Sequence, residues 1–351
     1  MTEPDMQTKL GLLDRLDQGA VICAEGYLFE FERRGYLQAG AFVPEVVLEE
    51  PQLVANLHRE FVHAGSDVVE AFTYYAHREK LRVIEKEHLL EPMNRQALQI
   101  AKEVANETGT LFAGDLANTN ICVPGDQSTF RAARGIFEEQ VGWAMEAGVD
   151  FVVGETFSLL DEALVALEVI RAAGVPSVIT LAIHRPGQTP EGISPAEACK
   201  RLEDAGADVV GLNCARGPQT MLPLLREIRA AVSCHVAALP VPYRTTEEEP
   251  TFQSLTDPAY ANFPDNRPFP VALDPFTCNR YEIADFTRDA YELGVHYLGV
   301  CCGAGPHHIR AMAEALGRTP PASRFSVDMS KHAYFGDDRI KKEYKEFSKQ
   351  L

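Results

Sequence analysis

Short apolar runs, each introduced by a glycine, recur along the chain. The letters AGSDVV at 64–69 return as AGVDFV at 147–152 and as AGADVV at 205–210, and more loosely as LGVHYL at 293–298. A glycine suits the left-handed end of a helix, and a short β-branched run after it is typical of a strand buried on both faces. The pattern therefore predicts buried parallel strands that each follow a helix.

Helical patterns with clear beginnings lie between these runs. Pro51 opens an amphipathic segment, Ser194-Pro195 forms a helix start, and the segment after Ser158 carries an apolar stripe that ends before Gly174. Eight strands are predicted near 20–24, 66–72, 109–115, 149–155, 175–183, 207–213, 234–240 and 296–301. Because strand and helix alternate about eight times, we expect a single α/β domain over residues 1–320, a (β/α)8 barrel of the TIM type rather than a doubly wound sheet.

Two regions lack this alternation. Residues 242–270 are polar and rich in proline, so we expect either a cover over the active site or a mobile segment. Residues 321–351 lie beyond a complete barrel as a C-terminal tail, whose helix carries an apolar stripe of Ile340, Tyr344, Phe347 and Leu351. The stripe could pack against the chain's own barrel or form a subunit contact, and both alternatives stay open.

Composition narrows the classes of function. The 351 residues include 33 Lys+Arg and 51 Asp+Glu, a formal charge of −18, which disfavours a nucleic-acid partner because phosphate binding needs clustered basic side chains. No apolar run reaches the roughly 18 residues of a membrane span, and the first residues lack the regions of a signal peptide. We therefore expect a cytoplasmic protein whose eight cysteines are reduced thiols, with metal or catalytic roles favoured over disulfides.

The ends of the predicted strands carry the candidate chemistry, because active sites of this fold lie at the carboxyl ends of the strands. The residues at these ends include Glu25, Glu155, Asn213, Cys214, Cys301 and Cys302. Neighbouring residues of a strand point to opposite faces, so Cys301 and Cys302 can share one ion only where the chain leaves the strand. Gly299 and Gly303 are expected to permit that bend.

Three thiolates without a fourth protein ligand are typical of a catalytic zinc site, which keeps one position open. A structural zinc site has four ligands, typically in CxxC pairs, and no such pair occurs in this chain. The alternative interpretation is that the three cysteines are small apolar side chains at strand ends. The residues alone leave both interpretations open.

Two short segments resemble the zinc motifs of the homocysteine S-methyltransferase family, GLNC at 211–214 and GVCCG at 299–303. The resemblance runs from about Ile22 to Tyr344 and includes ERRGY at 32–36, LHREF at 57–61, FTYYA at 72–76 and PHHIR at 306–310. The segment with Tyr74 and Tyr75, together with the tail, is more similar to the betaine-dependent branch of that family than to its S-methylmethionine-dependent branch.

The resemblance implies a Zn²⁺ ion held by Cys214, Cys301 and Cys302, which takes the sulfur of homocysteine as its fourth ligand. Glu155 matches the acid that holds the homocysteine amino group, and Tyr75 matches the tyrosine of the donor site. With these catalytic residues, the implied substrate-binding positions are Glu25, Gly26, Phe42, Tyr75, Glu155, Asn213 and Asp274.

Three positions depart from the family pattern. Glu25 and Gly26 follow Ala24 where the family has Asp-Gly-Gly, so the acid after the first strand is displaced by one residue. Val300 replaces a glycine before the cysteine pair. Phe42 replaces a tryptophan, the best cation–π partner, which weakens or reshapes the cage for a cationic donor.

Taken together, the residues and the resemblance predict an enzyme that transfers a methyl group from glycine betaine to homocysteine, giving methionine and dimethylglycine. The alternatives are another donor, such as proline betaine, S-methylmethionine or dimethylsulfoniopropionate, or a non-catalytic protein that binds zinc and a methyl donor. The amphipathic tail and the family's habit predict a homo-oligomer, most simply a dimer.

Overall fold

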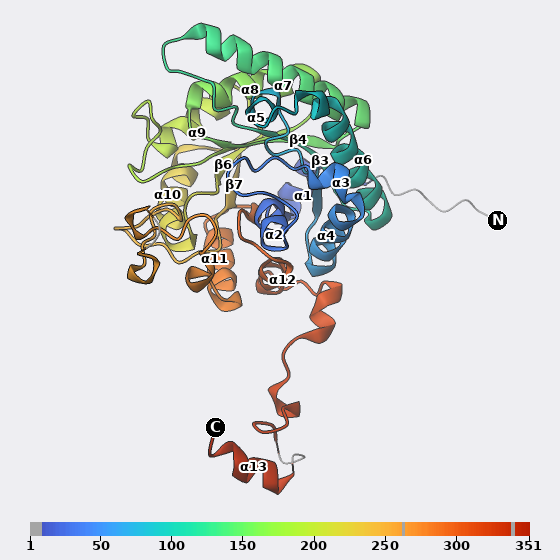
Figure 1. The fold of residues 1–351 in the computed structure, drawn as a ribbon, viewed down its shortest axis with the longest axis vertical. Helices are drawn as coiled ribbons and strands as arrows, with labels where there is room; N and C mark the ends of the chain where they lie inside the picture. Colours follow the sequence, from blue (N-terminus) through green and yellow to red (C-terminus); the bar gives the residue numbers. More distant parts are fainter. Residues whose placement is uncertain (1–8, 262–263, 338–340) are drawn as a thin grey trace, which may run out of the picture.

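A closed barrel of parallel strands forms the centre of the computed structural model, which describes residues 9–261, 264–337 and 341–351 (Figure 1). The strands are β1 (Val21–Ala24), β2 (Val68–Glu70), β3 (Leu111–Ala117), β4 (Phe151–Phe157), β5 (Ser177–Leu181), β6 (Val209–Asn213), β7 (His235–Leu239) and β8 (Tyr297–Val300). Each strand pairs with the next, and β8 closes on β1 with Val300 opposite Ala24. The predicted (β/α)8 fold is confirmed, and every predicted strand overlaps an observed one.

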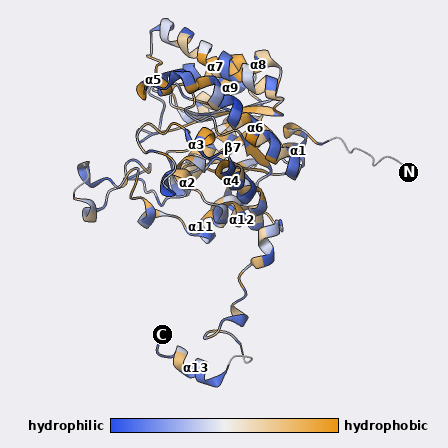
Figure 2. Ribbon diagram, turned by 45° about the vertical axis from the view of Figure 1, so that its right-hand side comes forward, coloured by the Kyte–Doolittle hydropathy of each residue, from blue (hydrophilic) through white to orange (hydrophobic). Residues whose placement is uncertain are grey.

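Helices surround the barrel and bury one face each against it. The helices that follow the strands are α4 (Pro51–Ala64), α6 (Leu90–Thr108), α7 (Gln127–Ala147), α8 (Leu160–Ala173), α9 (Pro195–Asp204), α10 (Pro218–Ala231), α11 (Arg280–Glu292) and α12 (Pro306–Ala315). The predicted starts agree with these bounds: the Ser194 side chain accepts a hydrogen bond from the backbone N–H of Glu197, and Pro51 is the first residue of α4. Hydrophobic and hydrophilic residues alternate along the outer helices in Figure 2, as one-sided burial requires.

Shorter elements lie at the ends of the barrel, in the connecting loops and in the C-terminal tail. They are α1 (Leu12–Gln18), α2 (Tyr27–Arg33), α3 (Val46–Glu49), α5 (Arg78–Val83), α13 (Lys342–Ser348) and the 3-10 helices η1 (Glu87–Leu89), η2 (Pro258–Tyr260), η3 (Pro264–Asn266), η4 (Asp274–Phe276), η5 (Pro321–Phe325) and η6 (Met329–Lys331). Leu12 and Leu16 of α1 are buried with Val21, Phe151 and Tyr297 in one apolar cluster of the barrel interior. The amino-terminal half of the barrel is therefore a packed core, and only its other end is available for a site.

The loop between β7 and α11 packs onto the carboxyl end of the barrel. Phe252 and Leu255 are buried, and the backbone N–H of Phe252 donates to the carbonyl of Ala215 at 2.8 Å. The hydroxyl of Thr220 donates to the carbonyl of Pro250, also at 2.8 Å. Of the two alternatives for this loop, these contacts favour a cover over a mobile segment for residues 250–255, which are fixed next to Ala215 and Thr220.

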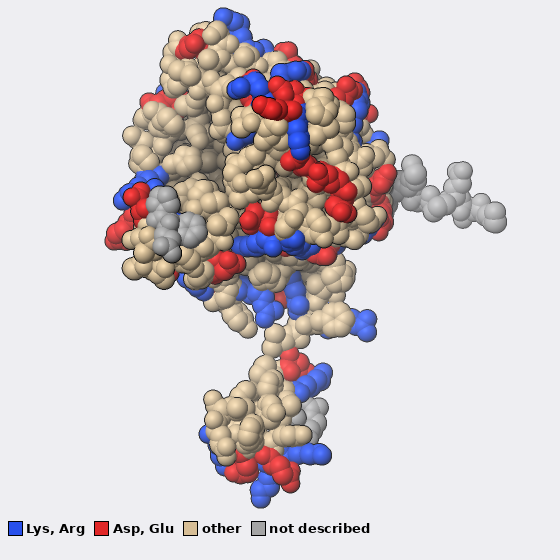
Figure 3. Space-filling view, viewed as in Figure 1, with Lys and Arg blue, Asp and Glu red and all other residues tan. Residues whose placement is uncertain are grey.

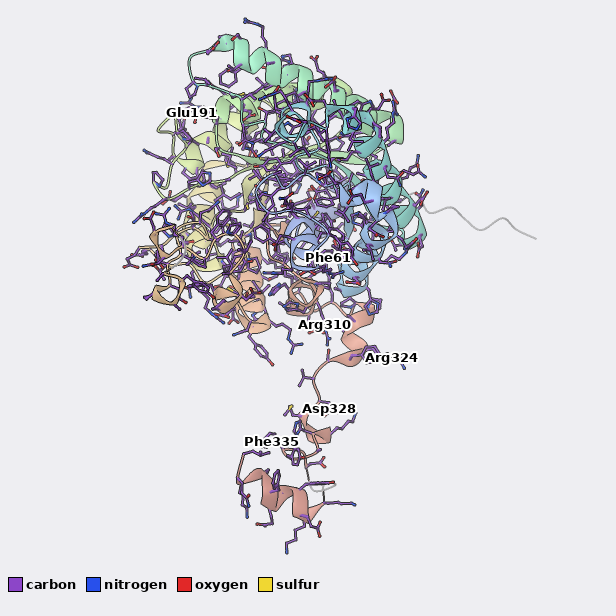
Figure 4. All side chains as sticks on the ribbon, in the orientation of Figure 1. Phe61, Glu191, Arg310, Arg324, Asp328 and Phe335 are labelled. Atoms are coloured by element: carbon purple, nitrogen blue, oxygen red, sulfur yellow. The ribbon has the colours of Figure 1, made fainter. Side chains whose placement is uncertain are left out.

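The C-terminal tail leaves the barrel after η5, and Figures 1 and 2 both place α13 far from it. Arg324, Asp328 and Phe335 follow one another along this tail in Figure 4. Tyr344 and Phe347 lie with their ring centroids 5.6 and 5.8 Å from that of Tyr334, within the tail itself. Packing of the stripe against the chain's own barrel is therefore wrong for these residues. Ile340, the first residue of the stripe, lies outside the described residues.

The described surface shows neither a membrane-spanning helix nor, on the face drawn in Figure 3, a basic patch. Within the described ranges, no helix combines the length and apolar character needed to cross a membrane. On the face shown in Figure 3, Lys and Arg side chains are interspersed with Asp and Glu, so basic groups form no continuous patch there. The functional site is therefore sought at the carboxyl ends of the strands.

Candidate metal and substrate site

Polar side chains replace apolar ones in the barrel interior one layer above the packed core. The apolar layer contains Cys23, Val68, Ala113 and Val153 from the first four strands. Two residues further along the same strands or just beyond them stand Glu25, Glu70, Asp115 and Glu155, all of them buried. Since side chains alternate between the two faces of a strand, positions two apart share the interior face. We call these four residues the acidic chamber.

The three cysteines of the predicted metal site come together at the rim. The sulfur atoms of Cys214, Cys301 and Cys302 all lie within 4.8 Å of one another, and those of Cys301 and Cys302 are 3.9 Å apart. Hydrogen bonds from the other two thiols hold the pKa of Cys214 well below its usual value. Three clustered sulfur donors are a set that suits Zn²⁺ or another soft metal ion and leaves room for one more ligand.

Backbone strain accompanies this arrangement. Cys214 and Ala215 have φ values of 55° and 53°, and Phe42, Tyr75 and Thr156 also have positive φ. Side chains other than glycine occupy this region at a cost on the order of 1–3 kcal/mol each, and such residues gather at functional sites. At Cys214 the turn takes the thiol out of the strand's alternation, as a shared ion would require.

Asn213 connects the cysteines to the acidic chamber. Its Oδ1 accepts hydrogen bonds from the backbone N–H of Thr156 and the hydroxyl of Thr180, both at 2.9 Å. These two donors fix the orientation of the amide, so its Nδ2 faces the carboxylates. Nδ2 donates to Oε2 of Glu155 at 2.5 Å and to Oε2 of Glu25 at 3.3 Å.

The acidic chamber holds four buried carboxyl groups, with no basic side chain from the described ranges beside them. Burial raises the pKa of Glu155 to about 8, and burial together with the neighbouring carboxylates raises the pKa of Glu25, Glu70 and Asp115 well above their usual values. The surrounding cavity is lined by no basic side chain of the described residues. Oε1 of Glu25 and Oδ1 of Asp115 are buried and have no hydrogen-bond partner within the described parts of the chain. The chamber therefore suits a cationic group with several N–H donors.

Glu70 and Asp115 were given no role by the sequence reasoning. Asp115 interrupts the apolar run of β3, and Glu70 ends β2, where its Oε2 accepts a hydrogen bond from the thiol of Cys23 at 3.3 Å. The available signal was the alternation of side chains between the two faces of a strand. Once the inward face of one strand was known, this alternation would have shown that all four carboxylates face inward.

Two tyrosines that contact each other lie next to the acidic chamber. The ring centroids of Tyr74 and Tyr75 are 4.2 Å apart, and the ring of Tyr74 lines the cavity together with Glu155 and Cys302. Burial raises the pKa of Tyr75, and the negative charge of Cys214 and Cys302 adds to this effect. Tyr75 therefore borders the cavity through its contact with Tyr74.

Comparison with known proteins assigns the chain. The sequence profile of the homocysteine S-methyltransferase family matches residues 26–316. The chain belongs to this family. A betaine–homocysteine S-methyltransferase 1 of Xenopus tropicalis is 38% identical over 329 residues, which cover 90% of this chain and 78% of the relative. An S-methylmethionine–homocysteine S-methyltransferase of Rattus norvegicus is 35% identical over 340 residues, covering 94% and 87% of the two chains.

A solved structure of the same class supports the fold. The metallated form of the homocysteine methyltransferase MmuM from Escherichia coli superposes with a TM-score of 0.66 at 15% identity, covering 86% of this chain and 98% of that one. With the family assignment, the three-cysteine cluster is a potential metal site of a homocysteine methyltransferase. The family assignment also favours an enzyme over the non-catalytic alternative.

The remaining predicted substrate residues of this methyltransferase lie at different places. Gly26 packs against Ala304, since a Cβ at Gly26 would lie 2.7 Å from the carbonyl oxygen of Ala304. Phe42 stacks on Phe29 with centroids 5.9 Å apart, and it does not line the cavity. The side chain of Asp274 is 75% exposed. Of the predicted residues, the structure therefore brings together the cysteines, Glu25, Glu155 and Asn213. Tyr75 lies next to the cavity through its contact with Tyr74, and Phe42 and Asp274 lie outside it.

The two glycines around the cysteine pair differ in their roles. Gly303 has a φ of 93°, and a Cβ there would meet the hydroxyl of Tyr243 at 2.2 Å, so it does permit the turn after the pair. The expectation that Gly299 permits a bend is wrong. Gly299 lies within β8, and a Cβ would clash with the carbonyl oxygen of Cys23 at 2.0 Å, so glycine is needed for close strand packing.

Arg33 is a further residue that sequence reasoning missed. Its guanidinium donates to the carbonyl of Gly303 at 3.1 Å and to the hydroxyl of Tyr243 at 2.8 Å, and it lies 3.8 Å from Asp274. It thereby joins α2, the turn after the cysteine pair and the loop after β7. No sequence signal relates positions so distant along the chain.

Proposed function

We propose that this enzyme transfers a methyl group from glycine betaine, or a similar onium donor, to homocysteine at a zinc ion held by Cys214, Cys301 and Cys302. The observation that carries the proposal is the placement of three buried sulfur atoms directly beside the acidic chamber. A site for homocysteine needs a means of activating a thiol and a means of holding an ammonium group a few bonds away, and these two features supply both.

The acceptor side of the site is built for an amino acid thiol. A zinc ion bound by the three thiolates would lower the pKa of a thiol in its open position and so supply a thiolate nucleophile at neutral pH. Glu155 and Glu25, both oriented by Asn213, offer carboxylate oxygens to the ammonium group of homocysteine. The Oε1 of Glu25, which has no partner among the residues that the structure describes, provides a further acceptor for an N–H of that group.

The donor side must place a methylated cation in line with the thiolate. Tyr74 and Tyr75 contribute aromatic rings, which attract onium groups that cannot donate hydrogen bonds. In the transfer the sulfur forms a bond to the methyl carbon while the C–N bond breaks, and its electron pair stays on nitrogen as a neutral tertiary amine. No proton moves in this step, so positioning rather than acid–base help is the main requirement. The products are methionine and, from glycine betaine, dimethylglycine.

A second donor class has support of its own. The relative from Rattus norvegicus bears the name of an S-methylmethionine-dependent enzyme, and its identity to this chain is close to that of the betaine-dependent relatives. Sulfonium donors such as S-methylmethionine or dimethylsulfoniopropionate also carry the positive charge that aromatic rings recognise. Proline betaine, like glycine betaine, is a quaternary ammonium donor, but it is larger.

Steady-state methionine formation tests the proposal. The zinc-loaded protein is incubated with homocysteine and one donor at a time: glycine betaine, proline betaine, S-methylmethionine or dimethylsulfoniopropionate. We expect methionine with glycine betaine at the highest kcat/KM. Turnover with S-methylmethionine alone would replace the proposed donor, and methionine formation that is unaffected by removal of the metal would overturn the zinc-dependent mechanism.

We also propose a homodimer formed through the tail. The tail leaves the barrel and presents exposed apolar side chains, among them Phe325, Phe335 and Leu351 at 69%, 57% and 71% exposure. Light scattering at micromolar concentration should give about twice the chain mass of 38.7 kDa, and a particle of single-chain mass would contradict the dimer. A reducing compartment such as the cytoplasm fits a site of three free thiols.

A further inference from the structure

A lysine of the chain already occupies the ring that the proposed donor site offers to an onium group. The ammonium nitrogen of Lys80 lies 3.8 Å from the ring centroid of Tyr75. Lys80 belongs to α5, the short helix that begins three residues after Tyr75. The ring of Tyr74 lies on Tyr75 as well, with 4.2 Å between the centroids. Little of the Tyr75 ring therefore remains open to a ligand while Lys80 stays in place.

The ammonium of Lys80 has no carboxylate partner, whereas the basic residues around it do. Arg78 pairs with Glu139, Arg82 pairs with Glu79, and Lys86 pairs with Glu45. Within the described parts of the chain, Lys80 makes no hydrogen bond or ion pair. It is only partly exposed, and burial lowers its pKa. A partly buried ammonium whose neighbouring arginine and lysine side chains are paired is a candidate for binding an anion that comes from outside the chain.

The proposed donor carries a carboxylate that could pair with Lys80 and an onium group that could take its place on the ring of Tyr75. Its onium group must approach the cysteine sulfurs, close to Tyr75, yet two cations at one ring repel each other strongly in a site of low dielectric. The carboxylate of an onium carboxylate is only a few bonds from its positive charge. If Lys80 moves from the ring to this carboxylate, the onium group can take the vacated place and both charges are matched.

We propose that Lys80 binds the carboxylate of the methyl donor, and that its ammonium covers the ring of Tyr75 until the donor's onium group replaces it. This inference rests on the proposed function and extends it to the donor class. Lys80 then makes the enzyme select onium carboxylates over cations that lack a carboxylate. Only an onium carboxylate offers Lys80 an ion pair in place of its contact with the ring.

The test compares two ligands in the zinc-loaded, full-length protein at saturating homocysteine. Glycine betaine carries both charges and is measured through its KM, while tetramethylammonium carries only the cation and is measured as a competitive inhibitor. In Lys80→Met we expect the KM for glycine betaine to rise about 10- to 30-fold with little change in kcat. The inhibition constant of tetramethylammonium should stay constant or fall, because no lysine then competes for the ring. Lys80→Arg should recover part of the loss.

Lys86→Met is the matched control, since Lys86 lies just beyond the same helix and pairs with Glu45 at the surface. It should change both constants less than about twofold. Equal changes in both constants in Lys80→Met, or no change in either, would overturn the role of Lys80 while leaving the methyltransferase proposal intact. A wild-type enzyme that forms methionine from no onium carboxylate would instead overturn both proposals.

Discussion

The acceptor side and the donor side of the proposed site are built in different ways. On the acceptor side, Cys301, Asn213 and Glu155 stand on or directly after strands, and Asn213 donates hydrogen bonds to Cys301, Glu155 and Glu25. The residues predicted for the donor side, Tyr75, Phe42 and Asp274, stand in loops or a short 3-10 helix, and each is held by a different neighbour. Under the proposed function, thiol activation would depend on the barrel, whereas donor choice would depend on loop segments that can vary independently.

Loss of one cysteine should break the acceptor side completely. In Cys214→Ala we expect zinc content to fall from one ion per chain to nearly none and methionine formation to drop by roughly three orders of magnitude or more, because two thiolates cannot complete the site. Metal analysis and steady-state kinetics measure both effects. Cys199→Ala, in the buried face of α9, is the control and should keep its zinc. Full zinc retention in Cys214→Ala would contradict the ligand assignment.

Loss of the ring at Tyr75 should affect the donor alone. Tyr75→Ala is expected to lower kcat/KM for glycine betaine by about one to two orders of magnitude, since a cation–π contact contributes on the order of 0.5–2 kcal/mol and more when desolvated. Tyr75→Phe should lose less. The affinity for homocysteine, measured by calorimetry, should stay nearly unchanged in both variants. Tyr281→Ala removes an exposed tyrosine of α11 as a control. Wild-type efficiency of Tyr75→Ala would show that the ring takes no part in donor binding.

The buried acids should make the stability of the metal-free protein depend on pH. Glu155 has a pKa of about 8 in the folded chain, so between the unfolded value near 4.3 and pH 8 the folded state holds a proton that the unfolded state has lost. Its contribution to stability is complete below the unfolded pKa and is lost as the pH rises through about 8. For each proton that only the folded state retains, the free energy of unfolding falls by up to about 1.4 kcal/mol for every unit by which the pH rises in this window.

Denaturant titrations of the metal-free wild type and of Glu155→Gln at several pH values between 5 and 8 measure this slope. We expect the stability of the wild type to fall with rising pH, and the fall to be shallower in the variant. A variant with the wild-type slope would show that Glu155 is already ionised at neutral pH in the folded protein.

Asp274 should have the smallest effect. Its side chain is 75% exposed and lies 3.8 Å from Arg33, and such surface pairs contribute about 0–1 kcal/mol. Asp274→Asn should therefore change kcat/KM for glycine betaine by no more than about fivefold. A loss of kcat/KM beyond about tenfold would indicate direct contact between Asp274 and the donor. The donor side would then, like the acceptor side, consist of residues that act together.

The contrast between the two sides also decides what could be predicted from the sequence. The barrel and the three cysteines were predictable because glycine-initiated apolar runs mark the strands, and strand ends meet at one face whatever the loops do. Val68 and Glu70, or Val153 and Glu155, share a face through the simple alternation of a strand, so the inward direction of the chamber was within reach as well.

Loop contacts could not be predicted in the same way. The place of Lys80 over Tyr75 depends on the φ of 60° at Tyr75, which redirects the chain before α5. Phe42 also has a positive φ and packs against Phe29 of α2, away from the cavity. Backbone conformations that are rare for such residues are set by tertiary packing and leave no periodic trace in the sequence.

X-ray absorption at the zinc K-edge tests the central claim most directly, because it counts the sulfur neighbours of the metal. The zinc-loaded protein alone should show three sulfur ligands and one lighter ligand, and addition of homocysteine should convert this to four sulfur ligands. A first shell that holds four protein ligands before homocysteine is added, or that does not change when it binds, would contradict the account.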